Sequence, residues 1–457
     1  MKKYLTIALL ICISNLQAQC WSDVSAYWYQ SFGIYNNGSL WGWGSNGADL
    51  LQVGDYVSRD NPVQVGTDSD WDQLYMGSNY VLALKTNGTL WAWGYNDEGQ
   101  LGDGTTVNKV SPVQIGSATW LKISAGHKSS YGIQSDGSLW AWGKNSAGEL
   151  GDGTSIQRLI PIQISSGTTW SDVSANFNHT LAIQSNGTLW SWGDNGFGQL
   201  GDGTNVSRNS PTQVGGSASW QSLSHSPSSQ FSLAIQSNGT LWAWGYNAYG
   251  QLGTGTTGAG VASNPIQVGT DSNWLQVACG SDHTLALKSD STLWSWGGNY
   301  VGQLGDGSTT QSNSPIQVGT GSNWKSISAG QGHSMALRSD GNAYSWGYNG
   351  FGQLGDGSQT NNPNPAIINC SVVLGNVFDN LVSQVLIYPN PTSTNLVVTM
   401  PEDSEVEYIS IVDLSGKKVH QQNGYFEPIP INHLKNGFYI VKIGNFVSET
   451  SFKMIKN

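Results

Sequence analysis

Two sets of side chains with metal-binding chemistry recur at regular intervals along the chain. Four histidines occupy one position of a sequence repeat and five aspartates occupy another, within the motif Leu-Gly-Asp-Gly: His127, His179, His283 and His333, and Asp103, Asp152, Asp202, Asp306 and Asp356. A zinc site needs its ligands in one compact cluster, and a calcium loop needs several oxygen ligands within one short stretch. Each repeat supplies only one such group. We therefore expect structural histidines and turn-capping aspartates, with no bound metal and no cofactor.

The remaining sequence offers no catalytic motif. It contains no nucleophile elbow, no cysteine–histidine pairing and no phosphate-binding loop. The expectation is therefore a protein that is not an enzyme. Carboxylates from several repeats could still meet in space, which leaves a polysaccharide-active enzyme as the alternative function.

Composition and charge argue against nucleic acid as a partner. Charged residues make up 11% of the chain, glycine accounts for 59 of 457 residues, and the formal net charge is −11. Few charges and many glycines suit short strands and tight turns. Binding to nucleic acid usually needs a basic patch, and the sequence shows none.

Short strands in a sevenfold repeat must position these residues. The core Leu-Trp-x-Trp-Gly, with Tyr344 replacing the first tryptophan in the seventh unit, recurs at intervals of 49 to 52 residues. Its second tryptophan falls at Trp43, Trp93, Trp142, Trp192, Trp244, Trp296 and Trp346. A fixed period of this length is typical of propellers and solenoids. Each unit reads as four strands, two of them joined by an Asn-Gly or Asp-Gly hairpin turn. The sequence thus predicts an all-β, seven-bladed propeller of four-stranded blades over residues 19–370, with the tryptophans packed between blades.

The consensus WxxVxAGxxHxxALxxDGxLWxWGxNxxGQLGxG resembles the regulator of chromosome condensation repeat. The likeness extends from Trp21 to Cys370 and implies a seven-bladed propeller. In the founding member of that family, the propeller exchanges nucleotide on a small GTPase and binds chromatin. Exchange depends on a wedge-like insertion, for which the even spacing here leaves no room. Activity like that of a guanine nucleotide exchange factor is therefore the third and least favoured function.

The N-terminus predicts export. Lys2 and Lys3 precede the apolar run Leu5–Ile13, and Ala18 supplies a small residue at the end of a cleavage motif. This order is typical of a secretory signal peptide, here residues 1–18. The apolar run is too short to span a membrane, and we expect no transmembrane segment.

The C-terminal residues predict a sorting signal. After a linker over residues 371–383, residues 384–457 alternate apolar and polar side chains, which indicates a small β-sandwich. Tyr388-Pro389-Asn390-Pro391 and Gly437-Phe438-Tyr439 resemble the C-terminal sorting domain of the type IX secretion system of Bacteroidetes. The resemblance implies that the secretion machinery is a partner. It also implies a protein that is secreted, or attached to the outer cell surface, after the domain is removed.

Two cysteines flank the repeat region. Cys20 precedes the first unit and Cys370 follows the last, and in a closed ring these two points meet. In an oxidising compartment we expect a disulfide between them that locks the ring. Two unpaired thiols are the alternative.

The favoured function is an extracellular binding module that presents one loop face to a protein or glycan. Positions where the repeats differ predict ligand contacts in the turns between the first two strands: Tyr27, Trp28, Tyr29, Tyr80, Lys128 and Phe177. Aromatic and basic side chains at a rim are typical interface anchors. Trp28 could instead replace a structural histidine. A second aromatic set follows the Leu-Trp-x-Trp-Gly strand, on a face that the sequence leaves open: Tyr95, Phe197, Tyr246, Tyr249, Tyr300, Tyr348 and Phe351.

Overall fold

The computed structural model describes most of the repeat region and the strands of the C-terminal region. The described residues are 21–47, 49–216, 219–258, 261–368, 386–388, 394–399, 408–413, 417–423, 429–444 and 449–456. The chain divides into two compact units, Met1–Asn369 and Cys370–Asn457. Every regular element in the described ranges is a β-strand, and none of them contains a helix that could cross a bilayer.

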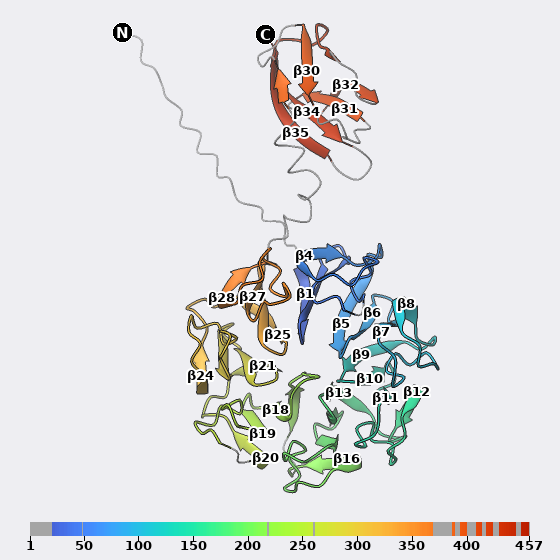
Figure 1. Ribbon diagram of the computed structural model, residues 1–457, viewed down its shortest axis with the longest axis vertical. Coiled ribbons are helices and arrows are strands. Elements are labelled where there is room, and N and C mark those ends of the chain that lie inside the picture. Colours follow the sequence, from blue (N-terminus) through green and yellow to red (C-terminus); the bar gives the residue numbers. More distant parts are fainter. Residues whose placement is uncertain are drawn as a thin grey trace. The chain divides into compact units, whose positions relative to one another are not determined.

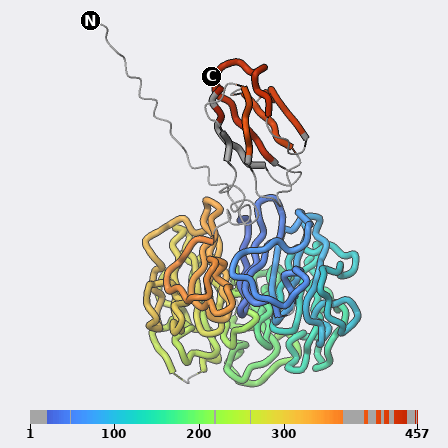
Figure 2. The backbone as a smooth tube through the Cα atoms, turned by 45° about the horizontal axis from the view of Figure 1, so that its top comes forward, coloured from blue at the N-terminus to red at the C-terminus, as the bar shows by residue number. Residues whose placement is uncertain are grey.

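Seven four-stranded antiparallel sheets surround a common axis as the blades of a propeller (Figure 1). Within each blade the strands follow one another in chain order. The first strand of each blade contacts the first strands of its neighbours, so these strands lie innermost. The blades can be followed around the ring from blue to orange in Figure 2. The structure confirms the predicted all-β, seven-bladed architecture.

The strands of the propeller have the following bounds. Blade 1 contains β1 (Trp21–Tyr27), β2 (Gln30–Tyr35), β3 (Leu40–Gly44) and β4 (Arg59–Gln64); blade 2 contains β5 (Trp71–Gly77), β6 (Tyr80–Lys85), β7 (Leu90–Gly94) and β8 (Lys109–Gln114); blade 3 contains β9 (Trp120–Ala125), β10 (Ser129–Gln134), β11 (Leu139–Gly143) and β12 (Arg158–Ile164); blade 4 contains β13 (Trp170–Ala175), β14 (His179–Gln184), β15 (Leu189–Gly193) and β16 (Arg208–Val214); blade 5 contains β17 (Trp220–Leu223), β18 (Phe231–Gln236), β19 (Leu241–Gly245) and β20 (Ala262–Gln267); blade 6 contains β21 (Trp274–Cys279), β22 (His283–Lys288), β23 (Leu293–Gly297) and β24 (Ser312–Gln317); blade 7 contains β25 (Trp324–Ala329), β26 (His333–Arg338), β27 (Ala343–Gly347) and β28 (Asn362–Ile367).

Tryptophans fill the seams between neighbouring blades. The second tryptophan of each Leu-Trp-x-Trp-Gly strand is fully buried. Trp142 of blade 3, for example, donates its indole N–H to the carbonyl oxygen of Gln100 in blade 2 at 2.9 Å. Gly102 lies against the same indole with φ +80°, and a Cβ there would come within 2.7 Å of the ring nitrogen. The recurring tryptophan and glycine are therefore packing residues, as the sequence predicts.

The ring closes between blades 7 and 1 through the same contact that joins the other blades. The amide of Trp21 donates to the carbonyl of Gly341 at 3.2 Å, just as the amide of Trp71 donates to Gly38 at 3.2 Å. Cys20 and Cys370 lie outside the described residues, so the disulfide between them stays a prediction.

The C-terminal unit consists of two small sheets. One has the order β32-β31-β34-β35 and the other β29-β30-β33. Apolar side chains from both sheets, among them Leu396, Ile411 and Val441, form one buried core. This arrangement confirms the predicted small sandwich. The strands are β29 (Leu386–Tyr388), β30 (Asn395–Thr399), β31 (Tyr408–Asp413), β32 (Lys418–Asn423), β33 (Ile429–Pro430), β34 (Gly437–Gly444) and β35 (Glu449–Lys456).

Candidate binding face

Strand pairing brings both variable aromatic sets to one face of the propeller. In blade 1, Gln30 at the start of β2 pairs with Gly44 at the end of β3. The β1–β2 turn and the long β3–β4 loop therefore lie at the same end of the blade. We call the end formed by these turns and loops in all blades the loop face, and the opposite end, with the β2–β3 hairpin turns, the hairpin face. The aromatic residues of the β1–β2-type turns and those that follow the Leu-Trp-x-Trp-Gly strands therefore both belong to the loop face, which the sequence alone did not determine.

Aromatic rings from three blades meet at the centre of the loop face. The ring of Trp28 lies 6.4 Å from that of His127, and His127 lies 4.6 Å from Phe177. Backbone bonds tie the turns together, because Gln331 donates its amide to the carbonyl of Trp28 and Ser78 donates to that of His127. These three rings are only partly buried. They form a central cluster that solvent can reach.

The central cluster continues outward over blades 1 and 7. Trp28 stacks on Tyr29, with ring centroids 5.9 Å apart. Tyr29 in turn lies 5.5 Å from Tyr348 and 5.0 Å from Phe351. Two residues that the sequence assigns to different aromatic sets are thus in direct contact. Trp28, Tyr29, Tyr348 and Phe351 form one continuous aromatic surface, which we call the seam cluster.

Further aromatic side chains line the loop face of blades 4 to 6. Phe197 and Tyr246 make an edge contact at 5.1 Å between blades 4 and 5. Tyr300 is 57% exposed, and its hydroxyl donates to the carboxylate of Asp282 at 3.2 Å. Burial raises the pKa of Asp282, although the hydrogen bond from Tyr300 opposes this shift. The aromatic surface is therefore bordered by acidic and neutral groups.

The cations of the loop face are already paired within the chain. Lys128 forms an ion pair with Asp97 in the neighbouring blade. Lys144 lies 3.6 Å from Glu149 and donates to Asn178 at 2.7 Å. The outer cations are paired in the same way: Arg59 with Asp55, Lys109 with Asp103, Arg158 with Asp152 and Arg208 with Asp202. Contact area from aromatic rings, rather than free positive charge, is what this face offers.

Two of the candidate ligand-binding tyrosines are buried. Tyr27 is 2% exposed and Tyr80 is 0% exposed. The hydroxyl of Tyr80 donates to the carbonyl of Ser129 at 2.8 Å and accepts from Ser130 at 3.0 Å. Contrary to the expectation from the sequence, neither tyrosine can contact a ligand at the surface. Trp28, Tyr29, Lys128 and Phe177 do lie on the loop face.

The repeated histidines hold neighbouring blades together, with one exception. His179, His283 and His333 each place Nε2 at 2.9 Å from a serine hydroxyl of the next blade. Burial lowers the pKa of His283 to about 3 and that of His333 to about 4. The expectation that His127 shares this position is wrong. His179 pairs with Gly193, the last residue of its Leu-Trp-x-Trp-Gly strand, and in blade 3 the residue that pairs with the matching Gly143 is Ser129. His127 lies two residues before Ser129, in the central cluster.

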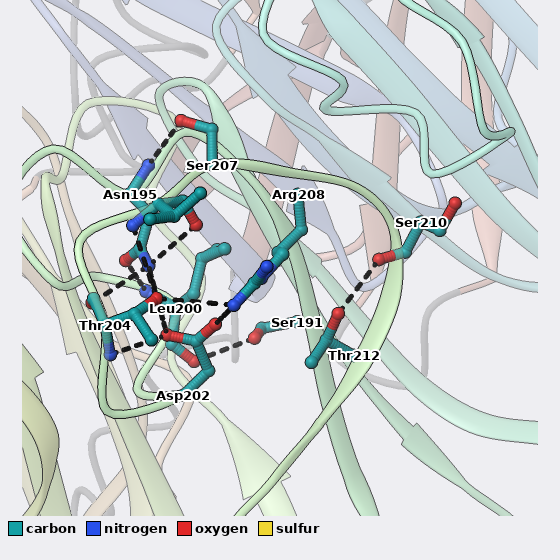
Figure 3. A network of polar contacts seen from close by, with 10 residues as sticks. Ser191, Asn195, Leu200, Asp202, Thr204, Ser207, Arg208, Ser210 and Thr212 are labelled. Atoms are coloured by element: carbon teal, nitrogen blue, oxygen red, sulfur yellow. Dashed lines mark hydrogen bonds and ion pairs between the residues drawn. The ribbon is translucent and has the colours of Figure 1, made fainter.

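The repeated aspartates cap turns in the long loops, as predicted. Figure 3 shows the β15–β16 loop, where Asp202 accepts from the amide of Thr204 at 2.9 Å and from the side-chain amide of Asn195 at 3.2 Å. The side-chain carbonyl of Asn195 also accepts from the amide of Leu200 at 3.0 Å. The organising role of this asparagine was not expected, although its recurrence in every unit could have indicated it. A rigid loop of this kind fixes the aromatic residues that it carries.

Known families match both units of the chain. The RCC1-like domain matches residues 12–268, and the regulator of chromosome condensation (RCC1) repeat matches residues 290–337 and 340–374. The secretion system C-terminal sorting domain matches residues 386–457.

Individual relatives match over short stretches. The protein RCC2 homolog of Danio rerio is 41% identical over 86 residues, which is 19% of this chain and 17% of that protein. The ultraviolet-B receptor UVR8 of Arabidopsis thaliana is 35% identical over 97 residues, 20% of this chain and 22% of that protein. The chain thus spans about a fifth of the length of these relatives.

Solved structures share the fold. Prp20p from Saccharomyces cerevisiae has a TM-score of 0.66 at 20% identity and covers 81% of this chain and 90% of its own. Human WBSCR16 has a TM-score of 0.61 at 21% identity, with coverages of 68% and 85%. Because the RCC1-like domain matches 257 of the 457 residues (12 to 268), the chain belongs to the RCC1-like domain family, and it carries a secretion system sorting domain at its C-terminus.

Proposed function

We propose that this protein is a secreted or cell-surface binding module whose loop face captures an extracellular protein or glycan. The observation that carries the proposal is the backbone of Trp28, which has φ +40°. A bulky side chain rarely adopts this left-handed conformation, and such strain is typical of functional positions. Glycine would relieve the strain, yet the chain places its one tryptophan outside the repeat pattern there.

The make-up of the surface supports recognition by contact area. The seam cluster presents large, rigid aromatic rings, which lose little conformational entropy on binding. Small polar residues lie in the turns that carry the central cluster and in those bonded to them, among them Ser78, Asn178 and Gln331. Rigid aromatic anchors surrounded by small polar side chains are typical of recognition surfaces.

The two ends of the chain support action outside the cell. The sorting domain implies handling by the type IX secretion machinery. We propose that residues 1–18 are a signal peptide and that residues 371–383 link the propeller to the sorting domain, although both segments lie outside the described residues. Mass spectrometry of the secreted protein should show a chain that ends before about Val385; a full-length secreted chain would contradict removal of the domain.

A capture experiment tests the binding function. The chain is immobilised and exposed to the proteins and glycans of its natural surroundings, alongside the variants Trp28→Ala and Leu275→Ala. Leu275 is the matched control, because it is an apolar side chain, 53% exposed, at the start of β21 and therefore near the hairpin face. We expect capture to be lost with Trp28→Ala and kept with Leu275→Ala. Equal capture by both variants would refute the assignment of the loop face. Shortening of a captured polysaccharide would favour the enzyme alternative instead.

A further inference from the structure

A polar cavity of about 130 Å³ lies among the innermost strands of the ring. Its wall includes strand residues from five blades and two residues from one loop, among them Asp23 of β1, Tyr75 of β5, Gln276 of β21 and Ser326 of β25. The loop contributes His225 and Pro227. This cavity is separate from the seam cluster, whose rings are absent from its wall.

The segment between β17 and β18 of blade 5 is longer than its counterparts and contributes to the cavity wall. From Leu223 to Phe231 the chain of blade 5 advances eight residues, whereas the matching advance from Leu74 to Tyr80 in blade 2 is six, so blade 5 is two residues longer here. His225, which stands two residues after Leu223 as Ala175 stands two residues after Val173, forms an isolated bridge with Ala278 of blade 6. Its ring also lies 5.5 Å from that of Tyr75 in blade 2. His225 therefore reaches from blade 5 across the axis of the ring.

The cavity wall holds polar groups with few or no hydrogen-bond partners among the described residues. The carboxylate of Asp23 accepts only from the amide of Val24, at 2.9 Å, and forms no ion pair in that part of the chain. The imidazole Nδ1 of His225 and the hydroxyl of Ser326 are buried with no hydrogen bond. Burial raises the pKa of Asp23 to about 6, with Asp72 adding to the shift and Lys325 opposing it. The negative charge of Asp23 is thus poorly compensated by the protein itself.

The aspartate at the matching position of blade 4 shows what compensation would look like. Asp23 and Asp172 are each the third residue of the innermost strand of their blade. The carboxylate of Asp172 lies 3.0 Å from the ammonium group of Lys122 in blade 3. The residue of the preceding blade that corresponds to Lys122 is Ser326, the third residue of β25, so Asp23 has a hydroxyl there in place of an ammonium group. One inward carboxylate is therefore neutralised within the chain, and the other is left open to a cation.

We propose that this cavity binds a small organic ammonium ion, with the carboxylate of Asp23 as its counter-ion and the ring of Tyr75 as an aromatic wall. A cation gains from the face of an aromatic ring, most of all where water is excluded. A volume of about 130 Å³ is well above the roughly 10–15 Å³ that one water molecule needs on the same measure, which leaves space for a methylated ammonium ion. The described residues contain no group of three histidine, cysteine, aspartate or glutamate side chains that could hold a metal ion.

Calorimetric titration of the full chain tests the proposal. The probe is trimethylammonium chloride, and the control probe is tert-butyl alcohol, a neutral molecule of similar size. We expect the cation alone to bind. Asp23→Asn should weaken its affinity by about tenfold or more, which corresponds to loss of one charge-assisted contact. Asp172→Asn is the matched control and should leave the affinity within about twofold.

Three results would overturn the proposal. They are equal binding of both probes, an affinity that Asp23→Asn leaves unchanged, and absence of any binding to a folded chain, in which case the cavity holds only water. Tyr75→Leu provides a second variant, and we expect it to weaken binding of the cation without abolishing it. Capture by the loop face should survive Asp23→Asn, so this proposal and the proposed function can fail separately.

Discussion

Replacement of Trp28 by glycine and by alanine separates its two roles. The left-handed backbone at this residue, with φ +40°, costs a residue other than glycine about 1–2 kcal/mol. Glycine removes that cost and alanine retains it. Both variants lose the packing of a partly buried indole on its neighbours, which we estimate at about 1–2 kcal/mol. We therefore expect Trp28→Ala to lose about 1–2 kcal/mol of stability and Trp28→Gly to lose about 0–1 kcal/mol.

The assay is equilibrium unfolding in urea, together with the capture experiment. Glycine should give the more stable variant by about 1 kcal/mol, although it is usually the less stable choice within regular structure. Capture should be lost in both. Asn79→Gly is the control, because Asn79 has φ +57° in the corresponding turn of blade 2 and asparagine tolerates this conformation well. We expect a small change there.

Two outcomes would refute the reasoning in different ways. A Trp28→Ala variant more stable than Trp28→Gly would show that the turn stores no backbone strain. A Trp28→Gly variant that is stable and still captures its ligand would show that the indole is not the anchor of the loop face. The pair of variants thus tests the strain and the recognition separately.

The remaining predictions concern protonation and covalent closure. Burial lowers the pKa of His283 to about 3. The contribution of the neutral imidazole to the free energy of unfolding is therefore complete above about pH 6.5, and acidification to pH 5 removes about 2 kcal/mol of it. His283→Phe, which copies Phe231 of blade 5, should make the urea midpoint less sensitive to acid. Because burial raises the pKa of Asp23 to about 6, the native state loses stability as pH rises through that value. Asp23→Asn should therefore stabilise the chain by about 2–3 kcal/mol at pH 8 but not at pH 4. Non-reducing peptide mapping should recover Cys20 linked to Cys370, and two free thiols would refute the disulfide.

Features that depend on periodicity could be predicted from the sequence. A tryptophan repeated at the same strand position must pack in the same kind of seam, as Trp142 does, because blades of equal length stack in the same way. Likewise, the aspartates of the long loops cap turns because a side-chain oxygen two residues before an amide readily accepts from it, as in Asp202 and Thr204.

Features that depend on register or on breaks in the repeat could not be predicted. His127 lies only two residues from the position of the structural histidines, and only the strand pairing distinguishes the two places. Tyr80 takes the buried position of the structural histidines in blade 2. The sequence does not show this, because a tyrosine stands there where several other blades have histidine. The cavity is lined by inward side chains of distant blades, and the extra length of blade 5 conceals that His225 takes the inward position that Ala175 has in blade 4.

The contact between Trp21 and Gly341 bears on where such a chain can begin and end. In some propellers the last blade combines strands from both ends of the chain, so moving the termini would break that blade. Here each blade is built from four consecutive strands, and the amide of Trp21 meets blade 7 as the amide of Trp71 meets blade 1. The seam between the first and last blades is thus held by the same backbone contact as the seam between blades 1 and 2. A circular permutant of the propeller alone, opened at another inter-blade loop and with its first and last blades joined, would preserve every blade. The ring should therefore form with the same blades whichever blade comes first in the chain.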